Sequence, residues 1–394
     1  MIRVLFSGKE LRERRRETIL HPPEGVEFRT MVPIEKLKPD FVISKTPSKT
    51  KLSFPEVIRK LIYTLEIPNI RYIPKRYLSD IDLIYTPGQL LLNKKPYVIE
   101  IDNAVCLAFF RLKILKKRMN LIKKFLEAEN CKRLICIGEA ARKSVINTFG
   151  SEKVSRKSTV VYPYVKINKY SEGRKDNKIV ILTSNTKFYM KGTRDVLLAF
   201  EVLNKKYSNL ELWIVSNTPK EYLEKYSQFK NIKFFPATFN KEELYRNFYS
   251  QCDIFVQPSY QDSLGMTYLE VAASGKPIIT TDIFGNPEVV ISGFNGFLIS
   301  PPFYMHNPDF TLKEEYFPIK VKDTENDFYK KINGQNVVRD LVKYASILIE
   351  NKKLREEMGQ NSLKLAKTRF SDDLRRKKLL EIFQSAITNN NHIK

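Results

Sequence analysis

The stretch DIFVQPSYQDSLGMTYLEVAASGKPIITT, residues 253–281, decides the fold that we expect for this chain. Its two ends, at 253–259 and 277–281, are short apolar runs typical of strands that are buried on both faces. The segment between them, 264–275, has the apolar spacing of a helix and stops at Gly275, shortly before a proline. A strand, a helix and a second strand in this order predict a βαβ unit, in which the two strands lie parallel.

The same alternation extends through the rest of the chain. In the second half we expect further strands at 178–184, 210–216 and 231–235, and helices at 193–207 and at 241–252, the last capped by Asn240. In the first half the strand candidates are 2–6, 27–32, 40–44, 82–86, 97–101 and 133–137, and the helix candidates are 54–65 and 139–149. A chain of 394 residues is too long for one comfortable core. We therefore predict an α/β protein of two doubly wound, Rossmann-like domains that face a cleft.

The domain boundaries follow from breaks in this pattern. The polar, charged run near 158–178 is the expected interdomain linker, so the first domain should cover 1–166 and the second 167–370. Residues 301–328 interrupt the alternation and are expected to form a loop insertion. The last segment, 371–394, is expected to be a separate C-terminal helix.

The composition is that of a globular protein. Hydrophobic residues make up 42% and charged residues 28%, and no apolar run approaches the ~18 residues of a membrane span. The N-terminus, MIRVLFSGKELRERRR, places a charge cluster after a short apolar piece, which is the wrong order for a secretory signal; we expect a cytoplasmic protein. The four cysteines lie in or near apolar segments, and no histidine lies near Cys131 or Cys136. We therefore expect buried free thiols and no metal site.

The positive charge is concentrated in the first half. The chain has a net charge of +24, of which residues 1–166 carry +17 and residues 167–394 carry +7. A field of this sign favours an anionic partner: nucleic acid, an acidic membrane surface or a phosphorylated substrate. A lysine-rich surface that serves only solubility gives the same composition.

One basic segment is also amphipathic. Residues 107–126, LAFFRLKILKKRMNLIKKFL, contain seven Lys or Arg and no acidic residue, interleaved with apolar residues. On a helix this gives a basic face beside an apolar face, the pattern of a segment that docks on an anionic membrane. The alternative is a helix whose apolar face packs in the core and whose basic face is solvated.

Two carboxylates near the opening stretch are candidates for ligand binding. Ligands of open α/β sheets bind beyond the carboxyl ends of strands, and Asp262 follows such an end. The next helix begins near Leu264 and Gly265; amide groups there, with Ser263, favour a phosphate. Glu270 lies five residues into the helix, about 7.5 Å along its axis at ~1.5 Å per residue, where a carboxylate could accept hydrogen bonds from a ribose. The alternative is a surface aspartate and a glutamate on a helix face.

At this point the residues resemble a known family. The segment 258–300 is similar to the family-4 retaining glycosyltransferases of the GT-B fold, whose mark is a Glu-x7-Glu pair followed by Gly-x-Pro, a Gly-Gly-x-x-Glu loop and a Gly-x-x-Gly turn. Segments 133–150, 190–200 and 354–383 also resemble that family. The resemblance covers about 83–390 and is specific over 240–300.

The resemblance implies roles for several residues. The second carboxylate of the pair, Glu270, is expected to bind the ribose of the nucleotide, and the first, Asp262, to contact the transferred sugar. Lys191 is expected to hold the donor diphosphate. Backbone amides near Gly285 and Asn286, with Glu288 nearby, are expected to face the same cleft. The resemblance implies no metal and no cofactor beyond the nucleotide-sugar substrate.

The chain departs from the family pattern at four places, one of which is the loop after the first strand, FSGKEL, with one glycine where the family often has several. Asp262 is an aspartate where the family has glutamate, and its arm is one methylene shorter. The usual Gly-Arg is missing before Lys191, so Lys187 is the expected substitute, with Ser184 and Asn185 near the diphosphate. A histidine of the first domain is also missing, and Asp102 or Asn103 would face the cleft there.

The combined expectation is a retaining, metal-independent glycosyltransferase of the hexosyltransferase type. It would take a UDP- or GDP-linked sugar in its second domain and a glycan or lipid-linked acceptor in its basic first domain. The helix at 371–394 would pack back on the first domain, and 107–126 would place the protein on the cytoplasmic face of a membrane. One alternative is a catalytically weak protein that binds nucleotide-sugars. A nucleic-acid-binding protein is the other, although no nucleic-acid motif is recognised and we expect no such partner.

Overall fold

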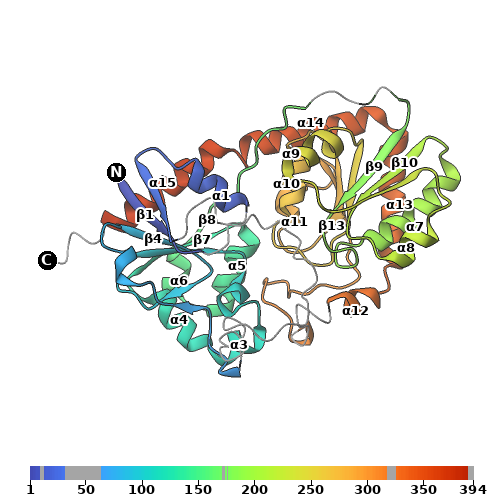
Figure 1. Ribbon diagram of the computed structural model, residues 1–394. Helices are drawn as coiled ribbons and strands as arrows, with labels where there is room; N and C mark the ends of the chain where they lie inside the picture. The colour runs from blue at the N-terminus through green and yellow to red at the C-terminus, as the bar shows by residue number, and fades with distance from the viewer. Residues whose placement is uncertain (9–12, 32–63, 171–173, 175, 317–324, 389–394) are drawn as a thin grey trace. The chain divides into compact units, whose positions relative to one another are not determined.

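The computed structural model describes residues 1–388 except 9–12, 32–63, 171–173, 175 and 317–324 (Figure 1). The strand predicted at 40–44 therefore lies outside the described residues, as does all but the end of the helix predicted at 54–65. By their internal contacts the residues form two units, each built on a parallel sheet. The first unit contains Met1–Pro163, Pro308–Phe317 and Asp373–Lys394, and the second contains Tyr164–Asn307 and Pro318–Asp372.

Within the described residues, the first unit has a six-stranded parallel sheet in the order β2-β1-β4-β6-β7-β8. Its strands are β1 (Ile2–Phe6), β2 (Val26–Thr30), β4 (Leu83–Pro87), β6 (Tyr97–Ile101), β7 (Cys131–Cys136) and β8 (Ser158–Val160), and β3 (Ile70–Arg71) pairs separately with β5 (Leu90–Leu91). Its helices are α1 (Glu13–Leu20), α3 (Leu112–Lys117), α4 (Met119–Glu127), α5 (Glu139–Phe149), α6 (Glu152–Lys157) and α15 (Asp372–Thr388). Short 3-10 turns lie at Lys75–Tyr77, Ala104–Ala108 and Glu314–Tyr316. The run YVIEI of β6 is buried at every position, which explains why a strand covered on both faces forms there.

The C-terminal helix α15 belongs to the first unit (Figure 1). Leu379 and Phe383 are buried in one hydrophobic cluster with Val4 of β1. The guanidinium of Arg375, which is 3% exposed, lies 3.2 Å from the carboxylate of Glu100 on β6. Apolar burial and a buried charge pair therefore both fasten α15 to the sheet.

As far as the structure describes it, the second unit has a six-stranded parallel sheet in the order β11-β10-β9-β12-β13-β14. Its strands are β9 (Ile179–Ser184), β10 (Leu210–Val215), β11 (Ile232–Phe235), β12 (Ile254–Gln257), β13 (Ile278–Thr281) and β14 (Gly296–Ile299). Its helices are α7 (Thr193–Lys206), α8 (Lys220–Lys225), α9 (Lys241–Leu244), α10 (Met266–Ala272), α11 (Asn286–Val289), α12 (Glu325–Lys330), α13 (Gln335–Glu350) and α14 (Lys352–Thr368). The first strand of this unit along the chain, β9, lies between β10 and β12 in the sheet, so the strand order reverses there. Two parallel-sheet α/β domains are thus present, as predicted.

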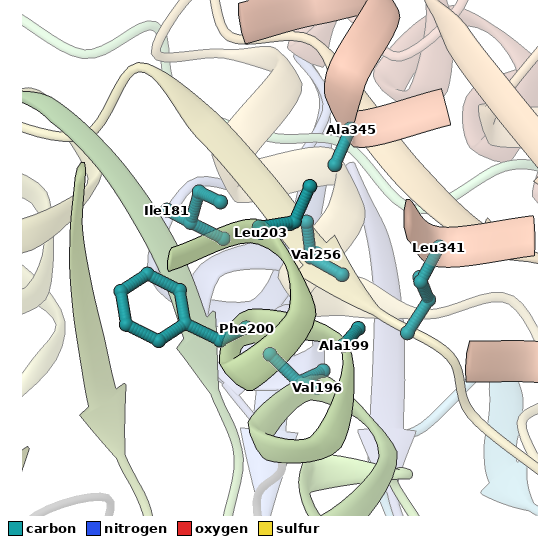
Figure 2. A pocket seen from close by; sticks show the side chains of 8 residues that line it. All are labelled: Ile181, Val196, Ala199, Phe200, Leu203, Val256, Leu341 and Ala345. Atoms are coloured by element: carbon teal, nitrogen blue, oxygen red, sulfur yellow. The ribbon is translucent and has the colours of Figure 1, made fainter. Parts of the chain in front are cut away.

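The core of the second unit is closely packed. A cavity of about 10 Å³ lies between α7, β9, β12 and α13. Figure 2 shows the side chains that line it: Ile181, Val196, Ala199, Phe200, Leu203, Val256, Leu341 and Ala345. A single water needs at least ~10–15 Å³ and two to four polar partners, and this lining is apolar. The cavity is therefore a packing void and not a ligand site.

Three segments differ from their prediction. The basic segment 107–126 is not one helix: it begins in the 3-10 turn that ends at Ala108 and continues as α3 and α4, which meet at Arg118. The helix predicted at 264–275 is α-helical over Met266–Ala272. The loop predicted at 301–328 ends inside α12. No described helix is both long enough and apolar enough to cross a membrane.

Candidate functional site

The carboxyl ends of β9 and β12 lie side by side where the strand order of the second unit reverses. β9 ends at Ser184 and β12 at Gln257, and the two strands are paired in parallel. In open α/β sheets, ligands bind outside the carboxyl ends of the strands at such a switch point. The residues predicted to bind the donor lie at the end of β9 or follow β9, β12 or the next strand, β13.

The structure brings Lys191 and Asp262 together at this edge of the sheet. Lys191 Nζ lies 2.7 Å from Asp262 Oδ2 and 3.1 Å from the backbone oxygen of Gln261. The lysine and aspartate side chains are 17% and 15% exposed. The two loops are also joined by their backbones, since Tyr260 N donates to Met190 O at 2.9 Å. An ammonium and a carboxylate so placed could bind an anion through the lysine and a hydroxyl through the aspartate.

The carboxylate of Glu270, on α10, is contacted by two side chains from the preceding segment. Lys241 Nζ lies 3.4 Å from Glu270 Oε1, and the Tyr249 hydroxyl lies 3.4 Å from Glu270 Oε2. Burial raises the pKa of Tyr249 well above its ordinary value, so the phenol stays protonated and can donate. The same hydroxyl lies 3.5 Å from Ser184 Oγ. Tyr249 therefore links Ser184 and Glu270, which were both predicted as site residues.

The loop after β9 is shaped by Asn185. Its amide Nδ2 donates to Thr193 Oγ1 at 2.8 Å, and its Oδ1 accepts from Ser216 Oγ at 3.0 Å. The backbone N of Lys187 also donates to Asn185 Oδ1, at 3.2 Å. The Asn185 side chain therefore bonds within the protein and holds this turn, while Lys187 is an exposed residue of the same loop.

Two glycines set the path of the loops after β12 and β13. Gly265 has φ +73°, and a side chain there would lie 2.1 Å from the ring of Tyr268. A side chain at Gly285 would lie 2.1 Å from the backbone oxygen of Ser263, so the two loops are in direct contact. Both positions therefore exclude a larger residue.

The other predicted residues of these loops are partly or fully buried. Ser263 N donates to Asp262 Oδ1 at 3.0 Å. Leu264 and Asn286 are buried, and Glu288 is half-buried. The helix after the first loop has seven residues, fewer than predicted, so its aligned dipoles supply little charge. Full positive charge beside these loops therefore comes from side chains such as Lys191.

Asp102 lies in the first unit, directly after β6, and is 5% exposed. The next residue, Asn103, caps a 3-10 turn by accepting from the backbone N of Val105 at 3.0 Å and of Cys106 at 3.2 Å. Burial, together with the charge of Asp102, raises the pKa of the Cys106 thiol to about 12. Asp102 is thus part of an ordered, buried turn.

The cysteines are free and buried, as predicted. Burial raises the pKa of the Cys131 thiol to about 11 and that of Cys252 to about 12, so neither is a thiolate at neutral pH. In the part of the chain that the structure describes, no group of three His, Cys, Asp or Glu side chains converges as a metal site requires.

Sequence reasoning missed Lys241 and Tyr249 as neighbours of Glu270. Both lie in 241–252, which was predicted to be one helix. Asn240 caps α9 as predicted, through a capping box with Glu243, but a π-helical turn at Tyr245–Tyr249 comes next. Such turns contain one extra residue and are frequent at functional sites. Apolar spacing does not reveal them.

Comparison with known proteins points to the same segment. The family model described as "Glycosyl transferases group 1" matches residues 165–306, which contain β9 to β14 and all donor-binding candidates. An uncharacterized glycosyltransferase of Methanocaldococcus jannaschii is 25% identical over 199 residues, 47% of this chain and 49% of that protein. Sucrose synthase 2 of Hordeum vulgare is 31% identical over 84 residues, 21% of this chain and 10% of that protein. The chain thus spans about half or less of the length of these relatives.

Among solved structures, that of HepE from Anabaena in complex with UDP and glucose superposes with a TM-score of 0.60. The superposition covers 98% of this chain and 100% of HepE at 14% sequence identity, and it shows the fold. The chain therefore has the GT-B fold of two parallel-sheet α/β domains. Residues 165–306, which carry the candidate site, have the sequence pattern of group 1 glycosyl transferases.

Proposed function

We propose that this chain is a retaining glycosyltransferase, which moves a hexosyl group from a nucleotide-sugar to an acceptor hydroxyl. The observation that carries the proposal is the placement of Lys191 and Asp262, 2.7 Å apart at the switch point, with Glu270 on the next helix. The match of this segment to group 1 glycosyl transferases supports sugar transfer. The fold likeness to HepE, whose structure contains UDP, supports a nucleoside diphosphate donor, either UDP- or GDP-linked.

Each part of the donor has a proposed partner. The carboxylate of Glu270 accepts hydrogen bonds from the ribose hydroxyls. The ammonium of Lys191 binds the diphosphate, aided by backbone amides of 263–265 and 285–286. The carboxylate of Asp262 accepts from a hydroxyl of the transferred sugar.

The proposed chemistry needs charge stabilisation and positioning. The acceptor oxygen attacks the anomeric carbon on the face that the nucleotide leaves, so the configuration is retained. The bond between that carbon and the diphosphate oxygen breaks, and this oxygen takes the proton of the acceptor. Lys191 offsets the charge that develops on the diphosphate as it leaves. In this proposal the positive charge comes from Lys191, the amides add hydrogen bonds, and no metal ion takes part.

We propose that the first unit binds the acceptor and that Asp102, which is 5% exposed, is the catalytic candidate of this unit, at the place where the family has a histidine near the sugar. The basic helices α3 and α4 of this unit differ from the amphipathic membrane segment that was predicted. Most of their apolar side chains, including Leu112, Leu115 and Ile122, are buried. Leu121 of α4 is 39% exposed, so most of this apolar face, but not all of it, is packed inside the unit. Lys113 and Lys117 form ion pairs with Glu66. We therefore propose electrostatic contact with anionic headgroups, without insertion, at the cytoplasmic face of a membrane that carries a lipid-linked acceptor.

This contact can be tested with vesicles. The protein should sediment with vesicles that contain an anionic lipid. Its affinity for these vesicles should fall about tenfold when the salt concentration rises from 50 to 300 mM. Equal binding to neutral vesicles would contradict an electrostatic contact.

The donor assignment can be tested by calorimetry. Glu270→Gln should keep the thermal unfolding temperature and weaken the binding of UDP or GDP by more than about tenfold, because a neutral amide is a poorer acceptor for two hydroxyls. If Glu270→Gln binds UDP and GDP with unchanged affinity, the ribose assignment is wrong. A panel of UDP- and GDP-sugars then separates an enzyme from a protein that only binds nucleotide-sugars. Binding without turnover of any donor would favour the second function, which the shorter Asp262 and the missing Gly-Arg motivate.

A further inference from the structure

A turn of π-helix, Tyr245–Tyr249, packs against the helix that carries Glu270. Ser250 N donates to Tyr245 O at 3.0 Å, five residues back, whereas an α-helical turn closes over four. One extra residue rotates the subsequent side chains by about 100° relative to an uninterrupted α-helix. Tyr245 and Tyr249 are both buried, and their rings are 5.6 Å apart. The turn thus brings the Tyr249 hydroxyl to α10.

The two carboxylate oxygens of Glu270 have different partners. Oε2 faces the Tyr249 hydroxyl at 3.4 Å, and that hydroxyl also lies 3.5 Å from Ser184 Oγ. Oε1 faces Lys241 Nζ at 3.4 Å. The ammonium also lies 5.8 Å from the ring centroid of Tyr245, within the range of a cation–π contact. The Lys241 and Glu270 side chains are 24% and 13% exposed, so solvent screens the pair only in part.

We infer that Tyr249 and Lys241 are positioning residues for the donor: Tyr249 fixes the orientation of the Glu270 carboxylate, and Lys241 offsets its charge beside an anionic nucleotide. The inference rests on the proposed function, in which Glu270 binds the ribose. A carboxylate is a good acceptor for two hydroxyls, but it repels the diphosphate that is joined to the same ribose. An ammonium held against the carboxylate reduces that repulsion and leaves an acceptor in place.

The two residues have separable signatures. The contribution of Lys241 to binding depends on the charge of the ligand. Replacing Lys241 should therefore weaken the binding of a nucleoside diphosphate and leave the binding of the uncharged nucleoside unchanged. The contribution of Tyr249 is geometric, so it should affect both ligands. A purely structural role of Lys241 would not discriminate between ligands by charge. A purely structural role of Tyr249 would lower the thermal unfolding temperature, which a positioning role leaves unchanged.

The experiment measures the affinity of the full chain for UDP and uridine, or GDP and guanosine if the wild type prefers GDP. Titration calorimetry serves for the diphosphate and displacement titration for the nucleoside, at 50 and 300 mM salt. The variants are Lys241→Met, Lys241→Arg, Tyr249→Phe and Glu270→Gln. The matched controls are Tyr245→Phe, in the same π-helical turn, and Lys225→Met, which breaks a lysine–glutamate pair elsewhere in this unit. Thermal unfolding of each variant reports on folding.

Lys241→Met should weaken the binding of the diphosphate about tenfold at low salt, and by less at 300 mM. It should change the affinity for the nucleoside by less than about threefold. Lys241→Arg should restore the diphosphate affinity. Tyr249→Phe should weaken both ligands by about three- to tenfold. Both controls should bind like the wild type.

Two results would overturn these assignments, and they are distinct. If Glu270→Gln weakens binding while Lys241→Met affects both ligands equally or Tyr249→Phe binds like the wild type, the inference is wrong and the ribose assignment stands. If Glu270→Gln itself binds like the wild type, the ribose assignment fails and the inference fails with it.

Discussion

Neutralising Asp262 should strengthen nucleotide binding and slow sugar transfer. Neutralising Lys191 should weaken nucleotide binding and slow sugar transfer as well. The sign follows from the pair itself. Lys191 Nζ lies 2.7 Å from Asp262 Oδ2, so in the proposed complex the ammonium stands between the aspartate and the diphosphate. The diphosphate is attracted by one member of the pair and repelled by the other.

The magnitude can be worked from the same distance. Adding a charge-assisted hydrogen bond of about 2.8 Å to the 2.7 Å contact places a phosphate oxygen about 5.5 Å from the Asp262 carboxylate. Two unit charges at that separation interact by about 3 kcal/mol at an effective dielectric constant of ~20. Both side chains are partly solvated, so we expect about 1 kcal/mol, or roughly fivefold tighter binding of UDP or GDP to Asp262→Asn. Lys191→Met leaves the carboxylate facing the diphosphate. It should reduce the binding free energy of UDP or GDP by about 2 kcal/mol or more, which is roughly thirtyfold in affinity.

Calorimetry with UDP and GDP gives the affinities, and release of nucleotide from the donor gives the turnover rate. The turnover of Asp262→Asn should fall about 10²-fold, because the transferred sugar loses a charged hydrogen-bond partner. Asp340→Asn, which removes an aspartate paired with Arg339 on α13, is the matched control and should change neither value. If Asp262→Asn and Lys191→Met weaken nucleotide binding alike, the pair is not arranged around a diphosphate and the reasoning is refuted.

Two further predictions concern stability. Arg375→Met should lower the free energy of unfolding by about 3 kcal/mol, because Glu100 stays buried with Arg15 as its remaining arginine; a loss below about 1 kcal/mol in urea unfolding would contradict this. Burial lowers the pKa of His306 to about 4. The centroid of its ring lies 4.4 Å from that of Phe284, the residue before Gly285. Since the unfolded chain binds this proton near pH 6.5, the contribution of His306 to stability is complete above that pH and is lost as the pH falls through 4. His306→Phe should reduce the pH dependence of the urea unfolding midpoint between pH 6.5 and 4, and an unchanged slope would argue against a partly buried neutral imidazole.

The sequence predicted the second sheet well because its parallel strands, such as β9 and β12, are continuous apolar runs between helical segments. It did not predict the order of the strands, because the local sequence of a strand does not specify which other strand it pairs with. Lys191 and Asp262 are 71 residues apart, and only the family resemblance placed them in one site. The break of the basic segment at Arg118 and the π-helical turn beside Glu270 were missed, because local apolar spacing is compatible with an uninterrupted helix at both places.

Retaining sugar transfer is tested by the anomeric configuration of the product, followed by NMR during turnover of UDP- and GDP-linked sugars. We expect the wild type to release the nucleotide and to form a product with the anomeric configuration of the donor, and we expect Glu270→Gln to slow this reaction. A product of inverted configuration, or no turnover of any donor that the protein binds, would contradict retaining sugar transfer.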